Sequence, residues 1–208
     1  ERVPLADVEL DAPLRPGVVF CLGLNYGAHL QEQGKAAPKE PEFFLKAGTT
    51  IAAPGEPHVL RPEVTAKLDA ETELGVVLGH DHRVYGYVVV NDVTARDRQV
   101  VPHPQGGFTM ALGPGKNFDG ATRVAAWVTT ADEIPDPQAL GLRQRVNGQL
   151  TQSSTTGHML HPVSSLLAYV GTLLTLPAGS LLATGTPAGT GWGHDPTIGG
   201  SGLVPDGC

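Results

Sequence analysis

Two apolar runs joined by a short connection constrain the fold of this chain most: "AETELGVVLG" at 70–79 and "VYGYVVVNDV" at 84–93. Their length and their β-branched content predict two neighbouring strands. Side chains alternate along a strand, so Glu71 and Glu73 share one face while Leu74 points to the other, as a core requires. Two like charges on a half-buried strand repel and are costly to desolvate unless a positive group lies between them. The first run therefore raises the question of what that positive group is.

A divalent cation is one answer, because a third carboxylate, Asp92, ends the second run. If the two strands pair, the three carboxylates meet at one place. Mg²⁺, Mn²⁺ and Ca²⁺ prefer such oxygen ligands, together with water or substrate oxygens. The alternative is that Glu71 and Glu73 are solvated on the exposed face of an antiparallel sheet and that Asp92 begins a turn. The spacing alone leaves both interpretations open.

The remaining pattern is typical of a mostly β fold with one or two helices packed on a sheet. Glycines (27) and prolines (18) are spread between short β-branched runs, which indicates turns rather than low complexity. Further strands are expected at 17–26, 43–48, 50–55, 122–130 and 179–191. A hairpin is expected at 140–152 with a type I′ turn at Asn147-Gly148, helical turns at 27–34 and after Thr94 as N-cap, and one amphipathic helix at 161–174.

Charge and cysteine content narrow the class of protein. The formal net charge is −7 and no block of Lys and Arg occurs, which argues against nucleic acid or an anionic membrane as the main partner. The two cysteines, Cys21 and Cys208, make no disulfide framework, so a reducing cytoplasm is the expected location. No signal peptide and no apolar stretch of about 20 residues is present. A small molecule is the expected partner.

Seven motifs in order resemble the fumarylacetoacetate hydrolase family: "LNYGAHLQE", "PEFFLKAGTTI", "ETELGVVLG", "GYVVVNDVTARDRQ", "GKNFDG", "VNGQLTQ" and "LLATGTPAGTG". Each motif is weak alone, but seven in register are specific. The resemblance runs from about Val18 to Gly191. It implies an α+β, mixed β-roll fold, a single catalytic domain over 1–208, a homodimer, and a divalent metal, Mg or Mn with Ca possible. Glu71, Glu73 and Asp92 fall on the family's metal-binding carboxylates.

Three residues match the family's catalytic positions. His29 and Glu32 are three apart in "HLQE" and can lie on one side of a helical turn, with the carboxylate orienting the imidazole as a general base. A His/Glu pair at this spacing is otherwise more often a surface pair. Lys116 in "GKNFDG" resembles the family's active-site lysine, which stabilises an enolate or carboxylate oxygen. Without the resemblance it would be interpreted as a solvated lysine in a Gly-rich loop.

Four further residues resemble the family's substrate-binding positions. Arg96 and Gln99 in "TARDRQ" are donors, and an arginine can hold a carboxylate through two hydrogen bonds. Asp97 is expected to be the structural partner of Arg96. Thr186 in "TGTP" offers a hydroxyl and a backbone N–H, although a plain tight turn is the alternative there. Lys46 in "FFLKAG" completes the set.

The implied chemistry is that of 2-oxo or enol acids through an enolate, on which the metal acts as a Lewis acid. We favour an isomerase or decarboxylase of the 2-hydroxyhepta-2,4-diene-1,7-dioate type in aromatic catabolism. Hydrolysis of C–C bonds in acylpyruvates or fumarylacetoacetate-like diketo acids, and oxaloacetate decarboxylation, stay as alternatives. From other classes, a Ca²⁺-stabilised binding module stays open, whereas a glycosidase is disfavoured by 5% aromatic residues.

Two departures from the family pattern stand out. The connection at 80–85, "HDHRVY", is shorter than is usual in the family, and the C-terminal stretch "IGGSGLVPDGC" lacks the usual closing Pro-Gly-Asp turn. The first departure is either a real shortening or the loss of a stretch between Gly79 and Gly86. The second concerns the end of the sheet and leaves the expected metal site intact.

Overall fold

A curled, mixed β-sheet forms the centre of the computed structural model, which describes residues 3–57 and 61–191. The sheet order is β2-β1-β14-β5-β6-β10-β3, and β11 pairs with β6. The strands are β1 (Val18–Gly23), β2 (Glu42–Ala47), β3 (Ile51–Ala52), β5 (Thr72–Leu78), β6 (Val84–Asp92), β10 (Thr122–Val124), β11 (Thr129–Thr130) and β14 (Leu181–Ala183). The pairs β1/β14 and β10/β3 are parallel and the others antiparallel, which makes the sheet mixed.

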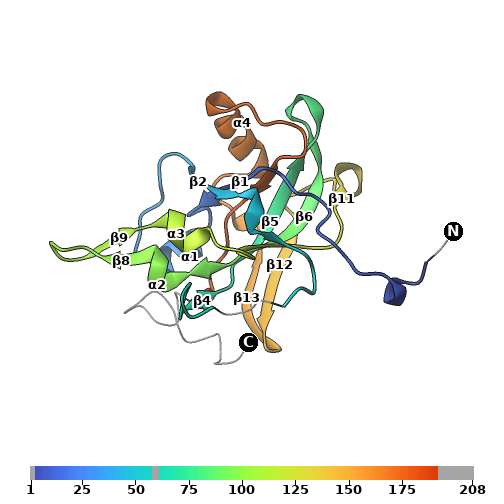
Figure 1. Ribbon diagram of the computed structural model, residues 1–208. Helices are drawn as coiled ribbons and strands as arrows, with labels where there is room; N and C mark the ends of the chain where they lie inside the picture. The colour runs from blue at the N-terminus through green and yellow to red at the C-terminus, as the bar shows by residue number, and fades with distance from the viewer. Residues whose placement is uncertain (1–2, 58–60, 192–208) are drawn as a thin grey trace.

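The two faces of β5 pack against different cores. Leu74, Val76 and Leu78 contact the long helix α4 (Val163–Leu173) and the neighbouring strands. Val77 packs on the other face with buried residues of β1, β6, β10 and β14. The first core confirms the expected apolar face of this run, and Figure 1 shows α4 beside the sheet near the upper ends of β5 and β6. Because both faces of β5 are buried, the exposed-face alternative for Glu71 and Glu73 is wrong.

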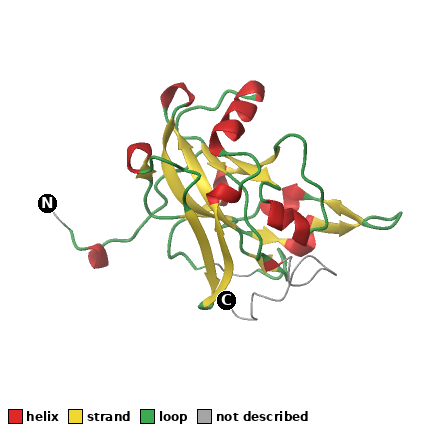
Figure 2. Cartoon of the chain, turned by 180° about the vertical axis from the view of Figure 1, so that it is seen from behind, coloured by secondary structure: helices red, strands yellow, loops and turns green. Residues whose placement is uncertain are grey.

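Three two-stranded ribbons extend the fold. The β12 (Gly141–Val146) and β13 (Gln149–Thr155) hairpin turns at Asn147 and Gly148, whose φ values of 50° and 80° confirm the expected turn residues. A second hairpin, β8 (Val100–Pro102) and β9 (Phe108–Met110), projects from the body in Figures 1 and 2. The third ribbon pairs β4 (Leu68–Asp69) with β7 (Thr94–Ala95), which brings the segment before Glu71 beside the segment before Arg96.

Three short helices lie at the end of β5 and β6 that carries the carboxylates. They are α1 (Gly27–Glu32), α2 (Arg96–Gln99) and α3 (Leu112–Lys116). Short 3-10 turns occupy Leu5–Asp7, Gly48–Thr50, His80–His82, Ala131–Glu133 and Thr156–His158. α2 and α3 pack so closely that a Cβ at Gly115 would lie 2.5 Å from the Cβ of Gln99. Glycine at this position therefore lets the segment that carries Lys116 approach Arg96.

Most of the expected elements are present, and one detail is wrong. Ala95, not Thr94, is the N-cap of α2, and the Thr94 hydroxyl instead donates to the carbonyl oxygen of Asp92 at 3.0 Å. Thr94 lies in a strand, where that hydrogen bond rigidifies the turn after Asp92. The atypical C-terminal stretch lies outside the described residues. Among the described helices, none has the length and apolar character needed to cross a membrane.

Candidate active site

Strand register brings the three predicted carboxylates together. Glu73 lies opposite Val90, and the backbone N–H of Asp92 donates to the carbonyl oxygen of Glu71 at 2.9 Å. Glu71, Glu73 and Asp92 are 5%, 2% and 2% exposed, and one carboxylate oxygen of each lies within 4.8 Å of the others. Three buried oxygen donors at this spacing fit a hard divalent cation.

Burial and like charge act most strongly on Glu73. Burial raises its pKa well above the usual value, and the neighbouring charges of Asp92 and Glu71 raise it further. Burial also raises the pKa of Glu71, but the positive charges of Lys116 and Arg96 outweigh that effect and hold it below its usual range. Two carboxylates on one strand face therefore differ in their preferred protonation, because Glu71 is paired with Lys116 and Arg96, whereas the charges of Asp92 and Glu71 oppose the ionisation of Glu73.

Lys116 places its ammonium between two of the three carboxylates. Its Nζ donates to Glu71 Oε2 and to Asp92 Oδ2, both at 2.7 Å, and lies 5.5 Å from the ring centroid of Phe44. Burial lowers the pKa of Lys116, but the charges of Asp92 and Glu71 outweigh burial and raise it, so the group stays protonated. Lys116 thus occupies the predicted site, although its contacts in this structure are with the carboxylates.

Arg96 is held by protein groups on three sides. Its Nε donates to Asp69 Oδ2 and one Nη to the Gln99 side chain, each at 2.7 Å, while the other Nη pairs with Glu71 Oε1 at 2.5 Å. The expectation that Asp97 is the partner of Arg96 is wrong, because Asp97 accepts from the Thr65 hydroxyl and the backbone N–H of Ala66. Arg96 therefore fixes Glu71 in addition to any role it has toward substrate.

Lys46 lies behind the carboxylate cluster rather than in the pocket. Its side chain is fully buried, and Nζ donates to Asp92 Oδ1 at 2.5 Å and to the carbonyl oxygen of Ala121 at 2.6 Å. It is not among the residues that line the pocket. This placement indicates a contribution to the orientation of Asp92, whereas the substrate-binding role assigned by resemblance stays a prediction.

His29 and Glu32 form a hydrogen-bonded pair on α1. Nδ1 of His29 lies 3.1 Å from Glu32 Oε2, and Nε2 lies 2.8 Å from Gln33 Nε2. The carboxylate of Glu32 only accepts hydrogen bonds, so Nδ1 of His29 donates to it, and the lone pair of Nε2 accepts from the Gln33 amide. The imidazole is 4% exposed and lines the pocket. The pair thus has the tautomer that a general base acting through Nε2 requires.

One loop after β14 donates backbone N–H groups to three carboxylates. Gly185 N–H donates to Glu73 at 2.9 Å, Gly189 N–H to Glu32 at 2.8 Å, and Gly191 N–H to Asp69 at 2.8 Å. At Gly189, φ is 98° and a Cβ would lie 2.1 Å from the carbonyl oxygen of Thr151, so only glycine fits. The loop therefore aligns the base pair and the acidic cluster at the same time.

The hydroxyl of Thr186, in the same loop, forms hydrogen bonds with other protein groups. It donates to the carbonyl oxygen of Thr72 at 3.0 Å and accepts from the Gln152 amide at 2.8 Å.

Two further residues near the site, Asp69 and Gln33, were not predicted from the sequence. Asp69 precedes Glu71 by two residues, the same spacing that separates Glu71 from Glu73, so the alternation carried a signal for it. Gln33 follows the "HLQE" motif and carried no comparable signal.

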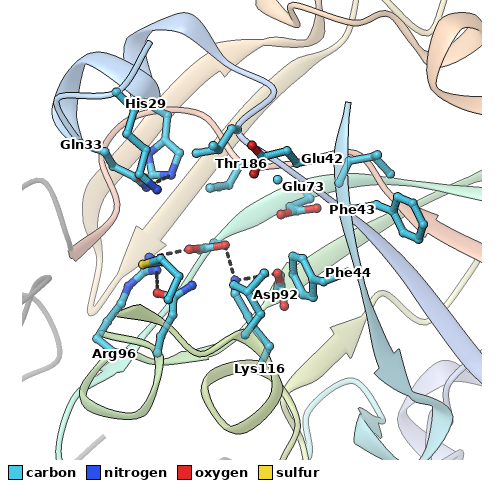
Figure 3. Close-up of a pocket in the computed structure, with 18 residues that line it drawn as sticks. His29, Gln33, Glu42, Phe43, Phe44, Glu73, Asp92, Arg96, Lys116 and Thr186 are labelled. Atoms are coloured by element: carbon cyan, nitrogen blue, oxygen red, sulfur yellow. Dashed lines mark hydrogen bonds and ion pairs between the residues drawn. The ribbon is translucent and has the colours of Figure 1, made fainter. Parts of the chain in front are cut away.

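A single pocket brings most of the predicted residues together. It is lined by eight of the ten: His29, Glu71, Glu73, Asp92, Arg96, Gln99, Lys116 and Thr186. Glu32 lies behind His29, and Lys46 behind Asp92. Figure 3 shows His29 and Gln33 on one side, Arg96 and Lys116 below, and Phe43 and Phe44 on the strand across the pocket. A histidine, two cations and an acidic cluster therefore face one space.

Comparisons with known proteins agree with this arrangement. The sequence model of the fumarylacetoacetate hydrolase C-terminal family matches residues 18–204. The mitochondrial oxaloacetate tautomerase Fahd2a of Rattus norvegicus is 37% identical over 207 residues, covering 94% of this chain and 64% of the rat protein. The chain therefore spans somewhat less than two thirds of that relative.

Two solved structures extend the likeness to three dimensions. A 2-hydroxyhepta-2,4-diene-1,7-dioate isomerase from Mycobacterium marinum has a TM-score of 0.74 at 34% identity, covering 91% of this chain and 71% of that one. Fumarylpyruvate hydrolase from Pseudomonas aeruginosa, solved with Mn²⁺ and pyruvate, has a TM-score of 0.73 at 25% identity, covering 91% and 88%. The likeness spans three different reactions, and one of these proteins holds a divalent metal.

Proposed function

This chain belongs to the fumarylacetoacetate hydrolase family, and from that premise we propose that it is a divalent-metal-dependent enzyme acting on 2-oxo or enol acids through an enolate. The observation that carries the proposal is the single pocket in which His29, Lys116 and the three carboxylates converge. A binding module stabilised by Ca²⁺ would not require a base and a lysine in that pocket. Isomerisation of the 2-hydroxyhepta-2,4-diene-1,7-dioate type is the leading activity.

Each side chain has a definite task in this proposal. Glu71, Glu73 and Asp92 would hold a divalent metal, which supplies Lewis acidity toward the adjacent carboxylate and carbonyl oxygens of a 2-oxo acid. His29 Nε2 takes a proton from the substrate and returns it to a different carbon, which completes a tautomerisation without any other reactant. Lys116, a fixed cation in a buried site, stabilises the negative charge on the substrate oxygen between the two proton transfers.

The alternatives use the same enolate and differ in what happens next. Cleavage of a C–C bond by water, as in acylpyruvate or fumarylacetoacetate-like substrates, or loss of CO₂ from oxaloacetate, would need the same base and cations. The named relatives divide among these reactions, so the family alone supports the class and the reaction has to be measured.

One screen tests the proposal. Incubation with 2-oxo dicarboxylates and acylpyruvates in the presence of Mg²⁺ or Mn²⁺ is expected to change the enol absorbance of at least one substrate. Coupled detection of pyruvate and of CO₂ separates hydrolysis and decarboxylation from isomerisation, which releases neither. A metal-saturated protein that turns over no member of the set would remove the support for an enzyme of this class.

Arg96→Lys is expected to raise KM and to weaken metal binding about tenfold. A lysine ammonium cannot span Asp69, Gln99 and Glu71 as the guanidinium does, so Glu71 loses its orientation. Arg98→Lys is the matched control, because Arg98 is exposed and donates to the backbone carbonyl oxygens of Val64 and Glu63. Calorimetric titration with Mn²⁺ gives the affinity. A raised KM with unchanged affinity would assign the guanidinium to the substrate alone.

A further inference from the structure

We infer that Lys35 determines specificity at the outer end of the pocket, selecting substrates whose carbon chain ends in a second carboxylate. This inference rests on the proposed function and extends it by naming the substrate class. Lys35 lines the same pocket as the acidic cluster and is partly buried there, whereas the carboxylates on the pocket floor are at most 5% exposed. Lys35 therefore lies nearer to solvent than the reacting end.

The backbone holds Lys35 close to the proposed base. After α1 the chain reverses at Gly34, where φ is 63°, and the N–H of Lys35 donates to the carbonyl oxygen of Leu30 at 2.9 Å. This hydrogen bond fixes Lys35 on the last turn of the helix that carries His29. The position of the Lys35 backbone is thus tied to the same element as the catalytic pair.

Lys35 differs from the other cations of the pocket in having no carboxylate partner. Arg96 pairs with Asp69 and Glu71, and Lys116 pairs with Glu71 and Asp92. Among the described residues, none places a carboxylate oxygen within 4.0 Å of the Lys35 ammonium. A partly buried cation without an ion-pair partner is suited to receive an anion from the ligand.

The lining of the same pocket also includes apolar residues. Phe43 and Phe44 come from β2, Met110 is the last residue of β9 and Leu112 is the first residue of α3. Such walls accept a hydrocarbon chain. A floor for a 2-oxo acid, apolar walls and a cation nearer to solvent together match a 2-oxo dicarboxylate, and they match an acylpyruvate with a neutral end less well.

The charges of Lys35 and Glu42 are expected to have opposite effects on the binding of a dicarboxylate. Burial lowers the pKa of Lys35 and the charge of Arg96 lowers it further, while Glu42 raises it. Glu42 is exposed at the start of β2 and also lines the pocket, where it would repel a ligand carboxylate. Removing the charge of Lys35 should therefore weaken binding of a dicarboxylate, and removing the charge of Glu42 should strengthen it.

Calorimetry on the Mn²⁺-saturated protein tests the inference with three ligands. Oxalate reports the metal end alone, while 2-oxohexanoate and 2-oxoadipate share a six-carbon chain and differ in a terminal methyl against a terminal carboxylate. Wild-type protein is expected to bind 2-oxoadipate about tenfold more tightly than 2-oxohexanoate. Lys35→Gln should abolish that difference and leave oxalate and 2-oxohexanoate unchanged, Glu42→Gln should enlarge it, and Lys39→Gln, an exposed lysine of the same loop, should preserve it.

The three ligands distinguish a failure of the Lys35 assignment from a failure of the proposed function. If oxalate binds but wild-type protein shows no preference for 2-oxoadipate, or Lys35→Gln retains the preference, the assignment of Lys35 is overturned while the proposed function stands. If oxalate does not bind to the Mn²⁺-saturated protein, the proposed function fails and the role of Lys35 fails with it.

Discussion

Glu73→Gln is expected to weaken divalent-metal binding by more than about 100-fold and to abolish metal-dependent turnover, while the protein still folds. The amide keeps the shape of the side chain and removes the charge of one of three oxygen donors that lie within 4.8 Å of one another. Titration with Mn²⁺ measures the loss, and Glu9→Gln, an exposed residue far along the chain from the cluster, is the control. Undiminished affinity in Glu73→Gln would show that the metal, if any, binds elsewhere.

In the metal-free protein, Glu73→Gln is expected to maintain or raise the free energy of unfolding, in contrast to its weakening of metal binding. The folded protein holds the pKa of Glu73 above its ordinary value near 4.5. Its contribution to stability is therefore complete below pH 4.5 and is lost as the pH rises through the raised pKa, because the folded state must then charge a buried group. Glutamine has no such loss. Metal-free Glu73→Gln should thus equal or exceed wild type in denaturant unfolding, by a margin that grows with pH.

Counting the buried charges explains why Glu73 behaves in this way. Four carboxylates (Asp69, Glu71, Glu73 and Asp92) meet three cations (Lys46, Arg96 and Lys116). With Glu73 protonated, three negative charges face three positive ones and the metal-free cluster is neutral. The remaining three carboxylates each contact at least one of these cations, whereas Glu73 receives a backbone N–H from Gly185. A divalent ion is the added charge that would let Glu73 ionise.

The strands of the site could be predicted because apolar side chains alternate along them with side chains of the opposite face, and the apolar ones must be buried. Leu74, Val76 and Leu78 had to face a core, and that requirement set Glu71 and Glu73 on the opposite face and made β6, with Asp92 at its end, the natural partner. The turn at Asn147 and Gly148 was equally local, since both residues tolerate positive φ. Patterns of period two and turn chemistry suffice for such features.

The partners of the charged residues could not be predicted in the same way. Lys46 reaches Asp92 only because β2 and β6 lie in one curled sheet, and that contact spans 46 residues. The Arg96 guanidinium meets Asp69 because β4 pairs with β7, two strands of two residues each, too short to leave a periodic signal. Asp97, adjacent in sequence, was the simpler expectation and was wrong. Sequence proximity is a poor guide wherever a buried charge selects its partner across the fold.

His29→Ala separates the base from the metal and is expected to lower kcat by about 10²–10⁴-fold while leaving Mn²⁺ affinity nearly intact. His29 contacts Glu32 and Gln33 and none of the three metal-site carboxylates by hydrogen bond among the described contacts. His80→Ala, at the other end of β5, is the control.

Glu32→Gln refines the same test, because it removes the anion and leaves one acceptor oxygen where the carboxylate has two, one for Nδ1 of His29 and one for the N–H of Gly189. Because the imidazole itself is retained, Glu32→Gln should reduce kcat less than His29→Ala does. Both variants should retain the calorimetric signature of Mn²⁺ binding. If His29→Ala lost metal binding and turnover together, His29 would be a ligand or a structural support, and the proton acceptor would have to be another residue lining the pocket.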